Sequence, residues 1–184
     1  MLFAAAHSQL LVVDIQERLL PAMAGPESVV KNTVTLMSAA RRLGVPVVIS
    51  EQYPERLGPS VAEVRDAAGN AAATFGKLSF SCARDAALKA HVEAARAGGR
   101  GQIVIAGIES HVCVMQSALD FAQAGMQVCV VGDAASSRQT TSHEAALARL
   151  AGAGVVVATT EMIVFEWLER AGSADFKALQ GLIK

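Results

Sequence analysis

Residues 102–121 read QIVIAGIESHVCVMQSALDF, and they contain the change of pattern that decides the fold. The first six residues, QIVIAG, form a near-continuous apolar run, which is typical of a strand covered on both faces. From residue 112 onward the apolar residues recur at helical spacing, and Gly125 follows where a helix would end. A buried strand that leads into a helix predicts one unit of a parallel α/β fold.

The same alternation extends in both directions along the chain. QLLVVD, VPVVIS and VVVATT are similar apolar runs, whereas AAATFG is the weakest of the six. They predict a doubly wound α/β domain with a six-stranded, mainly parallel sheet in the order 3-2-1-4-5-6 and helices on both faces. The expected strands are residues 9–14, 45–50, 71–76, 102–107, 127–132 and 154–159, and the expected helices are 27–43, 83–98, 112–124, 142–152, 160–170 and 174–182.

The totals limit the class of protein. A chain of 184 residues is expected to form a single domain, residues 1–184. Sixteen Lys and Arg against 17 Asp and Glu leave a formal net charge of −1, so the chain has no basic excess for nucleic acid. The apolar runs end long before the ~20 residues that span a bilayer. We therefore expect neither nucleic acid nor a membrane as a partner.

Other compositional features concern location and assembly. The N-terminal stretch MLFAAAHSQLLVVD lacks a basic region, and we expect it to belong to the mature protein. Three cysteines without a CxxC pair indicate a reducing, cytoplasmic environment and not a disulfide framework. Hydrophobic residues make up 52% of the chain, which predicts a buried sheet or subunit interfaces. A homo-oligomer, a dimer or larger, is expected.

Three reactive side chains follow predicted strands. Asp14 ends the first, Lys77 follows the third and Cys113 follows the fourth, and the first and fourth strands are neighbours in the expected order. Each residue has an ordinary explanation: a buried packing cysteine, an aspartate that caps a helix, and a lysine whose amine reaches solvent. Together they supply a nucleophile, a base and a cation. A helix start beside Cys113 would also lower the pKa of its thiol.

The sequence resembles the isochorismatase-like cysteine hydrolases, a superfamily that includes nicotinamidases, N-carbamoylsarcosine amidase and biuret hydrolase. SEQYPERLGPSV and GIESHVCV resemble the branch called isochorismatase domain-containing proteins. The resemblance covers nearly the whole chain, in the segments LLVVDIQERL, VPVVISEQYPERLGPSV, FGKLSFSC, IVIAGIESHVCVMQSALDFAQAGMQVCVVGDAASSR and VVVATTEMIVFEWL.

This resemblance implies a three-layer α/β/α domain and a catalytic triad of Asp14, Lys77 and Cys113. It also implies a cis peptide between Ile108 and Glu109 and an oxyanion hole made by the backbone N–H groups of Glu109 and Cys113. The implied activity is hydrolysis of a small amide, imide or ureido C–N bond through a thioester on the cysteine. The alternative is a catalytically silent or redox-responsive protein of this fold that acts through oligomerisation or partner binding.

The chain also departs from some members of the superfamily. Nicotinamidases carry an Asp and two His residues after the second strand to hold a metal, whereas this chain has EQYPERLG there. We therefore predict no metal and no cofactor. True isochorismatases cleave a vinyl ether by acid catalysis and need no cysteine, so Cys113 favours carbonyl chemistry on a small-molecule substrate.

Several further residues have two interpretations. Gln52 and Tyr53 either line the substrate pocket or belong to a plain loop, and His111 either donates to a ligand or orders its loop. The Glu109 carboxylate lies at the mouth of the site or is paired away from it. Four other residues are expected mainly to pack: Cys82, Cys129, Phe165 and Trp167.

Overall fold

The computed structural model describes residues 1–183 and contains one six-stranded sheet in the order β3-β2-β1-β4-β5-β6. This order confirms the prediction, and every pairing between these strands is parallel. The strands are β1 (Ser8–Val13), β2 (Val47–Gln52), β3 (Ala73–Lys77), β4 (Gln102–Ile108), β5 (Gln127–Ser136) and β6 (Val156–Ala158).

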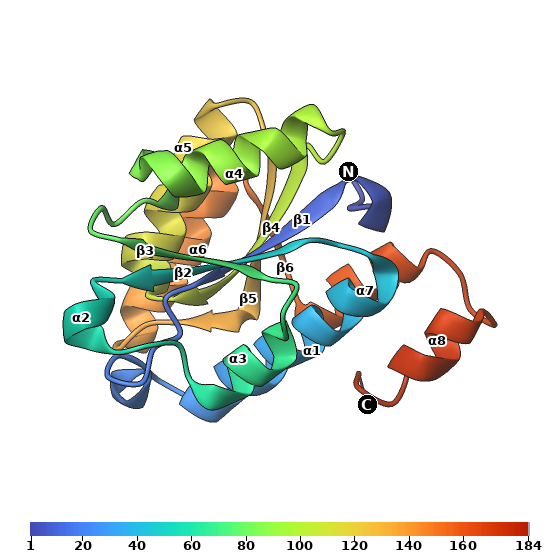
Figure 1. Cartoon of the computed structure of the whole chain (residues 1–184), viewed down its shortest axis with the longest axis horizontal. Helices are drawn as coiled ribbons and strands as arrows, with labels where there is room; N and C mark the ends of the chain where they lie inside the picture. The colour runs from blue at the N-terminus through green and yellow to red at the C-terminus, as the bar shows by residue number, and fades with distance from the viewer. Residues whose placement is uncertain (184) are drawn as a thin grey trace.

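Helices cover both faces of the sheet (Figure 1). α1, α3, α7 and α8 lie on one face, and α4, α5 and α6 lie on the other. The α-helices are α1 (Pro26–Leu43), α2 (Pro54–Leu57), α3 (Ala62–Ala68), α4 (Ala86–Ala97), α5 (Met115–Gln123), α6 (Thr140–Gly152), α7 (Thr160–Leu168) and α8 (Ala174–Leu179). Short 3-10 turns are η1 (Ala5–His7), η2 (Leu20–Ala22) and η3 (Cys82–Arg84), and η4 (Ser110–Val114) is a π-helical turn.

Two hydrophobic clusters, one on each face of the sheet, hold the layers together. β1 contributes to both because its side chains alternate: Leu10 and Val12 pack toward α1, and Leu11 and Val13 pack toward α4 and α5. All six residues of this strand are buried. Full burial explains why its last four residues, LLVV, are an uninterrupted apolar run.

Two predicted helices begin differently in the structure, and two others were not predicted. The helix expected from residue 83 begins after η3, at Ala86. Asp85 caps it, because its carboxylate accepts from the N–H groups of Ala87 and Leu88. The helix expected from residue 112 begins as the turn η4. α2 and α3 were missed because prolines and glycines interrupt the helical periodicity between residues 53 and 69.

The strand register brings the polar strand ends to one edge of the sheet. Val13 pairs with Ser50 on one side and with Gly107 on the other, so the chain after β1 lies between the ends of β2 and β4. Gln52 pairs with Lys77 at the end of β3. Within residues 1–183, no helix is both long and apolar enough to cross a membrane.

Candidate active site

Asp14 is the buried anion at the centre of this edge. It adopts a left-handed conformation with φ of +54°, which Asp tolerates better than most residues, and β1 ends there. Its Oδ1 accepts a hydrogen bond from Ser50 Oγ at 2.7 Å, and its Oδ2 accepts one from Lys77 Nζ at 2.7 Å. The carboxylate therefore binds side chains from two other strands and does not cap a helix.

Lys77 points into the protein instead of reaching solvent. Its side chain and that of Asp14 are 0% and 1% exposed. The ammonium also donates to Gln52 Oε1 at 2.6 Å and to the Phe80 carbonyl at 3.2 Å. Burial is the largest influence and opposes the charged form, but the charge of Asp14, the two neighbouring cysteines and the hydrogen bond to Asp14 together outweigh it. The pKa of Lys77 is therefore raised, and the residue is a cation at neutral pH.

Cys113 lies in the turn η4, which connects β4 to α5. The Gln52 amide joins it to the ion pair, since Gln52 Oε1 is 2.6 Å from Lys77 Nζ and 4.0 Å from Cys113 Sγ. The peptide bond between Ile108 and Glu109, just before this turn, is cis. The structure thus brings Asp14, Lys77 and Cys113 together at one point.

The thiol of Cys113 does not have the lowered pKa that the helix start predicts. Burial raises its pKa well above its ordinary value, and the neighbouring charge of Asp14 raises it further. Lys77 acts in the opposite direction but is outweighed. The predicted lowering of this pKa is wrong, because a helix start stabilises the thiolate less than burial and the nearby carboxylate destabilise it.

The other predicted site residues fall in different places. Tyr53 is 43% exposed and borders a cleft of about 550 Å³ whose lining also includes Lys77 and Arg84. His111 Nδ1 lies 2.9 Å from Ser137 Oγ, so it is bonded to the end of β5. The Glu109 carboxylate accepts from the backbone N–H and the Nε of Arg138 and is paired away from the thiol.

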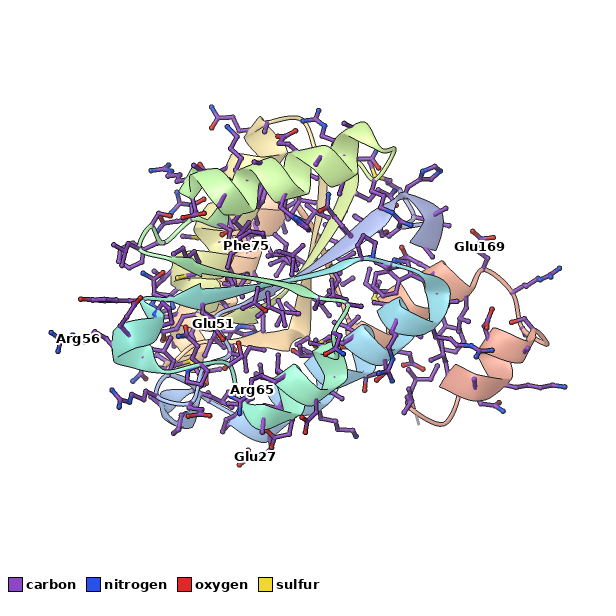
Figure 2. All side chains as sticks on the ribbon, viewed as in Figure 1. Glu27, Glu51, Arg56, Arg65, Phe75 and Glu169 are labelled. Atoms are coloured by element: carbon purple, nitrogen blue, oxygen red, sulfur yellow. The ribbon has the colours of Figure 1, made fainter. Side chains whose placement is uncertain are left out.

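Charged residues near Gln52 are turned away from Asp14, Lys77 and Cys113. Glu51 accepts from both the N–H and the hydroxyl of Ser60, at 2.7 and 2.8 Å. Arg56, on α2, extends away from the body of the protein (Figure 2). Gln52 is thus the side chain of this segment that reaches Lys77.

Three polar residues of the site were not predicted. Ser50 bonds the carboxylate of Asp14, and Gln16 bonds both the backbone N–H and the carbonyl of Gln52. The Ser117 hydroxyl accepts from the Cys82 N–H and donates to the Cys113 carbonyl. Ser50 had a signal in the sequence, since it ends the run VPVVIS just as Asp14 ends QLLVVD.

Two of the residues expected to pack have additional contacts. Trp167 is buried and donates from its ring N–H to Ser8 Oγ, whereas Phe165 is 44% exposed and lies against Phe176 with the two rings tilted. Cys82 and Cys129 are fully buried. Within the part of the chain that the structure describes, no group of three His, Cys, Asp or Glu side chains could hold a metal ion.

Comparison with known sequences gives a consistent set of relatives. The profile of the isochorismatase domain matches residues 8–162. Isochorismatase domain-containing protein 1 from Danio rerio is 38% identical over 181 residues, which are 97% of this chain and 62% of that protein. Isochorismatase domain-containing protein 2 from Danio rerio is 36% identical over 176 residues, 96% of this chain and 86% of that protein. The chain thus spans less than two thirds of the first relative.

Comparison with solved structures shows the same fold. The structure described as the MAR1 ribonuclease from Caenorhabditis elegans superimposes with a TM-score of 0.92 at 28% identity, over 100% of this chain and 92% of that chain. Escherichia coli YcaC, described as an octameric hydrolase of unknown specificity, gives a TM-score of 0.91 at 22% identity, over 99% and 90% of the two chains. At that identity the second likeness concerns the fold alone.

Proposed function

Because the chain belongs to the isochorismatase family, whose members are generally hydrolases, we propose that it is a cysteine hydrolase of small amides, imides or ureido compounds. The observation that carries this proposal is the buried pair of Asp14 and Lys77, joined to Cys113 through Gln52. Burying an ion pair costs desolvation free energy, so its presence beside a thiol favours a functional role for the pair. A nucleophile, a base and a cation in one place suit acyl transfer.

The proposed reaction begins from a protonated thiol. Asp14 takes the proton of Cys113 as the sulfur attacks the carbonyl carbon, and a C–S bond forms. Asp14 then gives this proton to the departing nitrogen as the C–N bond breaks. Water then attacks the thioester and passes a proton to Asp14. As the C–S bond breaks, Asp14 returns this proton to the sulfur, so the thiol is restored and the carboxylic acid is released. General-base catalysis of this kind suits a thiol whose pKa is raised.

The remaining groups have supporting roles in this proposal. Lys77 pairs with the Asp14 carboxylate and offsets the negative charge that the sulfur acquires. The backbone N–H groups of Glu109 and Cys113 hold the oxyanion of the tetrahedral intermediate. Tyr53 borders the adjacent cleft and contacts the substrate from there.

The location and partners of the protein are part of the proposal. The three cysteines are free, which suits a reducing, cytoplasmic environment, although one relative is named the secreted isochorismatase effector Isc1, of Phytophthora sojae. We propose that RNA is not a substrate, because a formal net charge of −1 gives no excess of cations to neutralise phosphates. Self-association is proposed from the apolar composition.

The direct experiment is a screen of small amides, ureas and imides for release of ammonia or amine. We expect at least one class to turn over, and Cys113→Ala to lower the rate at least 1,000-fold, about 4 kcal/mol of activation free energy, since no nucleophile remains. Intact-mass spectrometry during turnover should show an acyl adduct on the wild-type chain.

Cys129→Ala is the matched control, because it removes a buried thiol from the opposite cluster. This variant should keep wild-type turnover. Equal rates for Cys113→Ala and wild type, or an absence of turnover across the whole panel, would reject the proposed hydrolase activity. Either result would favour the alternative of a catalytically silent or redox-responsive protein.

A further inference from the structure

Ser50 binds Asp14 through its backbone and through its side chain. The Ser50 carbonyl accepts from the Asp14 N–H at 3.0 Å, and the Ser50 hydroxyl donates to Asp14 Oδ1 at 2.7 Å. Both residues are 0% exposed, so water does not compete for these bonds. An ionised carboxylate can only accept, which fixes the direction of the side-chain bond.

The hydroxyl of Ser50 has a partner of its own. Cys82 Sγ lies 3.5 Å from Ser50 Oγ. The Ser50 proton is already directed at Asp14, so the oxygen presents its lone pairs and the Cys82 thiol donates. Burial, and then the charge of Asp14, raise the pKa of Cys82, which keeps it a protonated donor. A chain of hydrogen bonds therefore runs from Cys82 through Ser50 to Asp14.

These hydrogen bonds, together with the bond from Lys77, restrict the orientation of the Asp14 carboxylate. Oδ1 is held by Ser50 and Oδ2 by Lys77, on strands β2 and β3. An ionised carboxylate has roughly four lone-pair sites, so two occupied sites leave the others for a proton from another direction. The neighbouring charge that acts on the Cys113 thiol is that of this fixed carboxylate.

We propose that Ser50 is a positioning residue that holds the Asp14 carboxylate toward the Cys113 thiol, and that Cys82 is the donor that orients the Ser50 hydroxyl. The inference rests on the proposed role of Asp14 as the base for Cys113. It also gives Cys82 a role distinct from nucleophile and from simple packing. Neither Ser50 nor Cys82 contacts the substrate in this role.

The test measures how strongly Asp14 acts on the thiol, using iodoacetamide at pH 8 and peptide mass spectrometry to follow Cys113 alone. At a pH below the thiol pKa, the alkylation rate is proportional to the thiolate fraction. Asp14→Asn removes the charge that raises the pKa and should accelerate alkylation at least tenfold, one pKa unit. Ser50→Ala removes the hydrogen bond that holds the Asp14 carboxylate toward the thiol. It should accelerate alkylation of Cys113 about threefold, which is half a pKa unit.

Three further variants separate positioning from a general structural effect. Ser50→Thr keeps the hydroxyl and should react at the wild-type rate. Cys82→Ala should accelerate alkylation less than Ser50→Ala, and Cys129→Ala should not change it. Adding Ser50→Ala to Asp14→Asn should change the rate less than twofold, because no charge remains to be positioned.

The outcomes distinguish the two proposals. If Asp14→Asn leaves the rate unchanged, the pairing of Asp14 with Cys113, and with it the proposed function, fails. If Asp14→Asn accelerates alkylation but Ser50→Ala does not, or if Ser50→Thr behaves like Ser50→Ala, the positioning role is overturned. Circular dichroism checks folding, and should Asp14→Asn not fold, the comparison of Ser50→Ala with Ser50→Thr still decides the positioning role.

Discussion

At the scale of single residues, surroundings decide what each cysteine can do. All three thiols are buried, and burial raises the pKa of each. Cys113 differs because it lies beside a carboxylate that can take its proton. Cys82 lies near the same carboxylate, but Ser50 stands between them. Cys129 packs in the cluster with α1 and has a structural role.

The buried thiols predict a loss of stability at alkaline pH. Burial, and then the charge of Glu166, raise the pKa of Cys129 from 9.0 to about 12. Between these values the folded chain retains a proton that the unfolded chain has lost, so the unfolding free energy falls as the pH rises. One such thiol contributes a slope of up to about 1.4 kcal/mol per pH unit.

Urea denaturation between pH 7 and pH 10.5 measures this slope. Cys129→Ala should be less stable than wild type at pH 7, because packing is lost, but its stability should fall less steeply above pH 9. Val131→Ala removes buried apolar volume from the same strand without a titrating group and should retain the wild-type slope. Parallel curves for wild type and Cys129→Ala would contradict the raised pKa.

At the scale of elements, α6 and the segment that joins it to β5 hold the turn η4, which contains Cys113. Ser110 Oγ lies 2.8 Å from His143 Nδ1 in α6, and His111 Nδ1 lies 2.9 Å from Ser137 Oγ. Arg138 bonds Glu109 just before the turn. The two histidine bonds therefore connect the turn η4 to α6 and to the chain after β5, which favours the loop-ordering interpretation of His111.

The approach of β4 to β1 depends on a single glycine. Gly107 has φ of +124°, and a Cβ at this position would overlap the backbone of Val13, the residue before Asp14. We expect Gly107→Ala to destabilise the fold by more than about 3 kcal/mol, since both the backbone conformation and the strand pairing oppose it.

Gly101, the residue before the same strand, is the matched control. It has open space around the position of a Cβ, so Gly101→Ala should change stability by less than about 1 kcal/mol. Thermal and urea unfolding of both variants give the comparison. A Gly107→Ala protein that unfolds like wild type would show that β4 does not approach Val13 this closely.

At the scale of the whole molecule, one sheet contributes side chains to two hydrophobic clusters, and the larger of them packs against α1. Leu36 on α1 and Leu88 on α4 are both 0% exposed, and they lie on opposite faces of the sheet. Because β1 contributes to both clusters, loss of either should unfold the other. We propose that the chain folds as one cooperative domain.

The two faces can be tested separately. Leu36→Ala and Leu88→Ala should each cost about 2 to 5 kcal/mol from lost burial and cavity formation. In each variant, far-UV circular dichroism and the fluorescence of Trp167, the single tryptophan, should give the same midpoint. Leu78→Ala, at a side chain that is 72% exposed, should change stability by less than about 0.5 kcal/mol. Two separate midpoints in Leu88→Ala would reject a single cooperative unit.

The sequence by itself determined the fold class, the strand order and the positions of the reactive residues. Apolar runs and helical spacing are local properties, and the parallel winding places the polar residues that end β1, β3 and β4 at one edge. For this reason Asp14, Lys77 and Cys113 could be proposed together, whereas the short helices α2 and α3, which lack clear periodicity, could not.

Only the tertiary structure decided how these residues act on one another. The bonds of Asp14 to Ser50, of Ser50 to Cys82 and of His111 to Ser137 join segments 26 to 36 residues apart. The raised pKa of Cys113 depends on burial and on the distance to a charge, and neither follows from local sequence. Hydrogen bonding and desolvation act through space. The packing of side chains from segments distant in sequence therefore determined these bonds and this pKa.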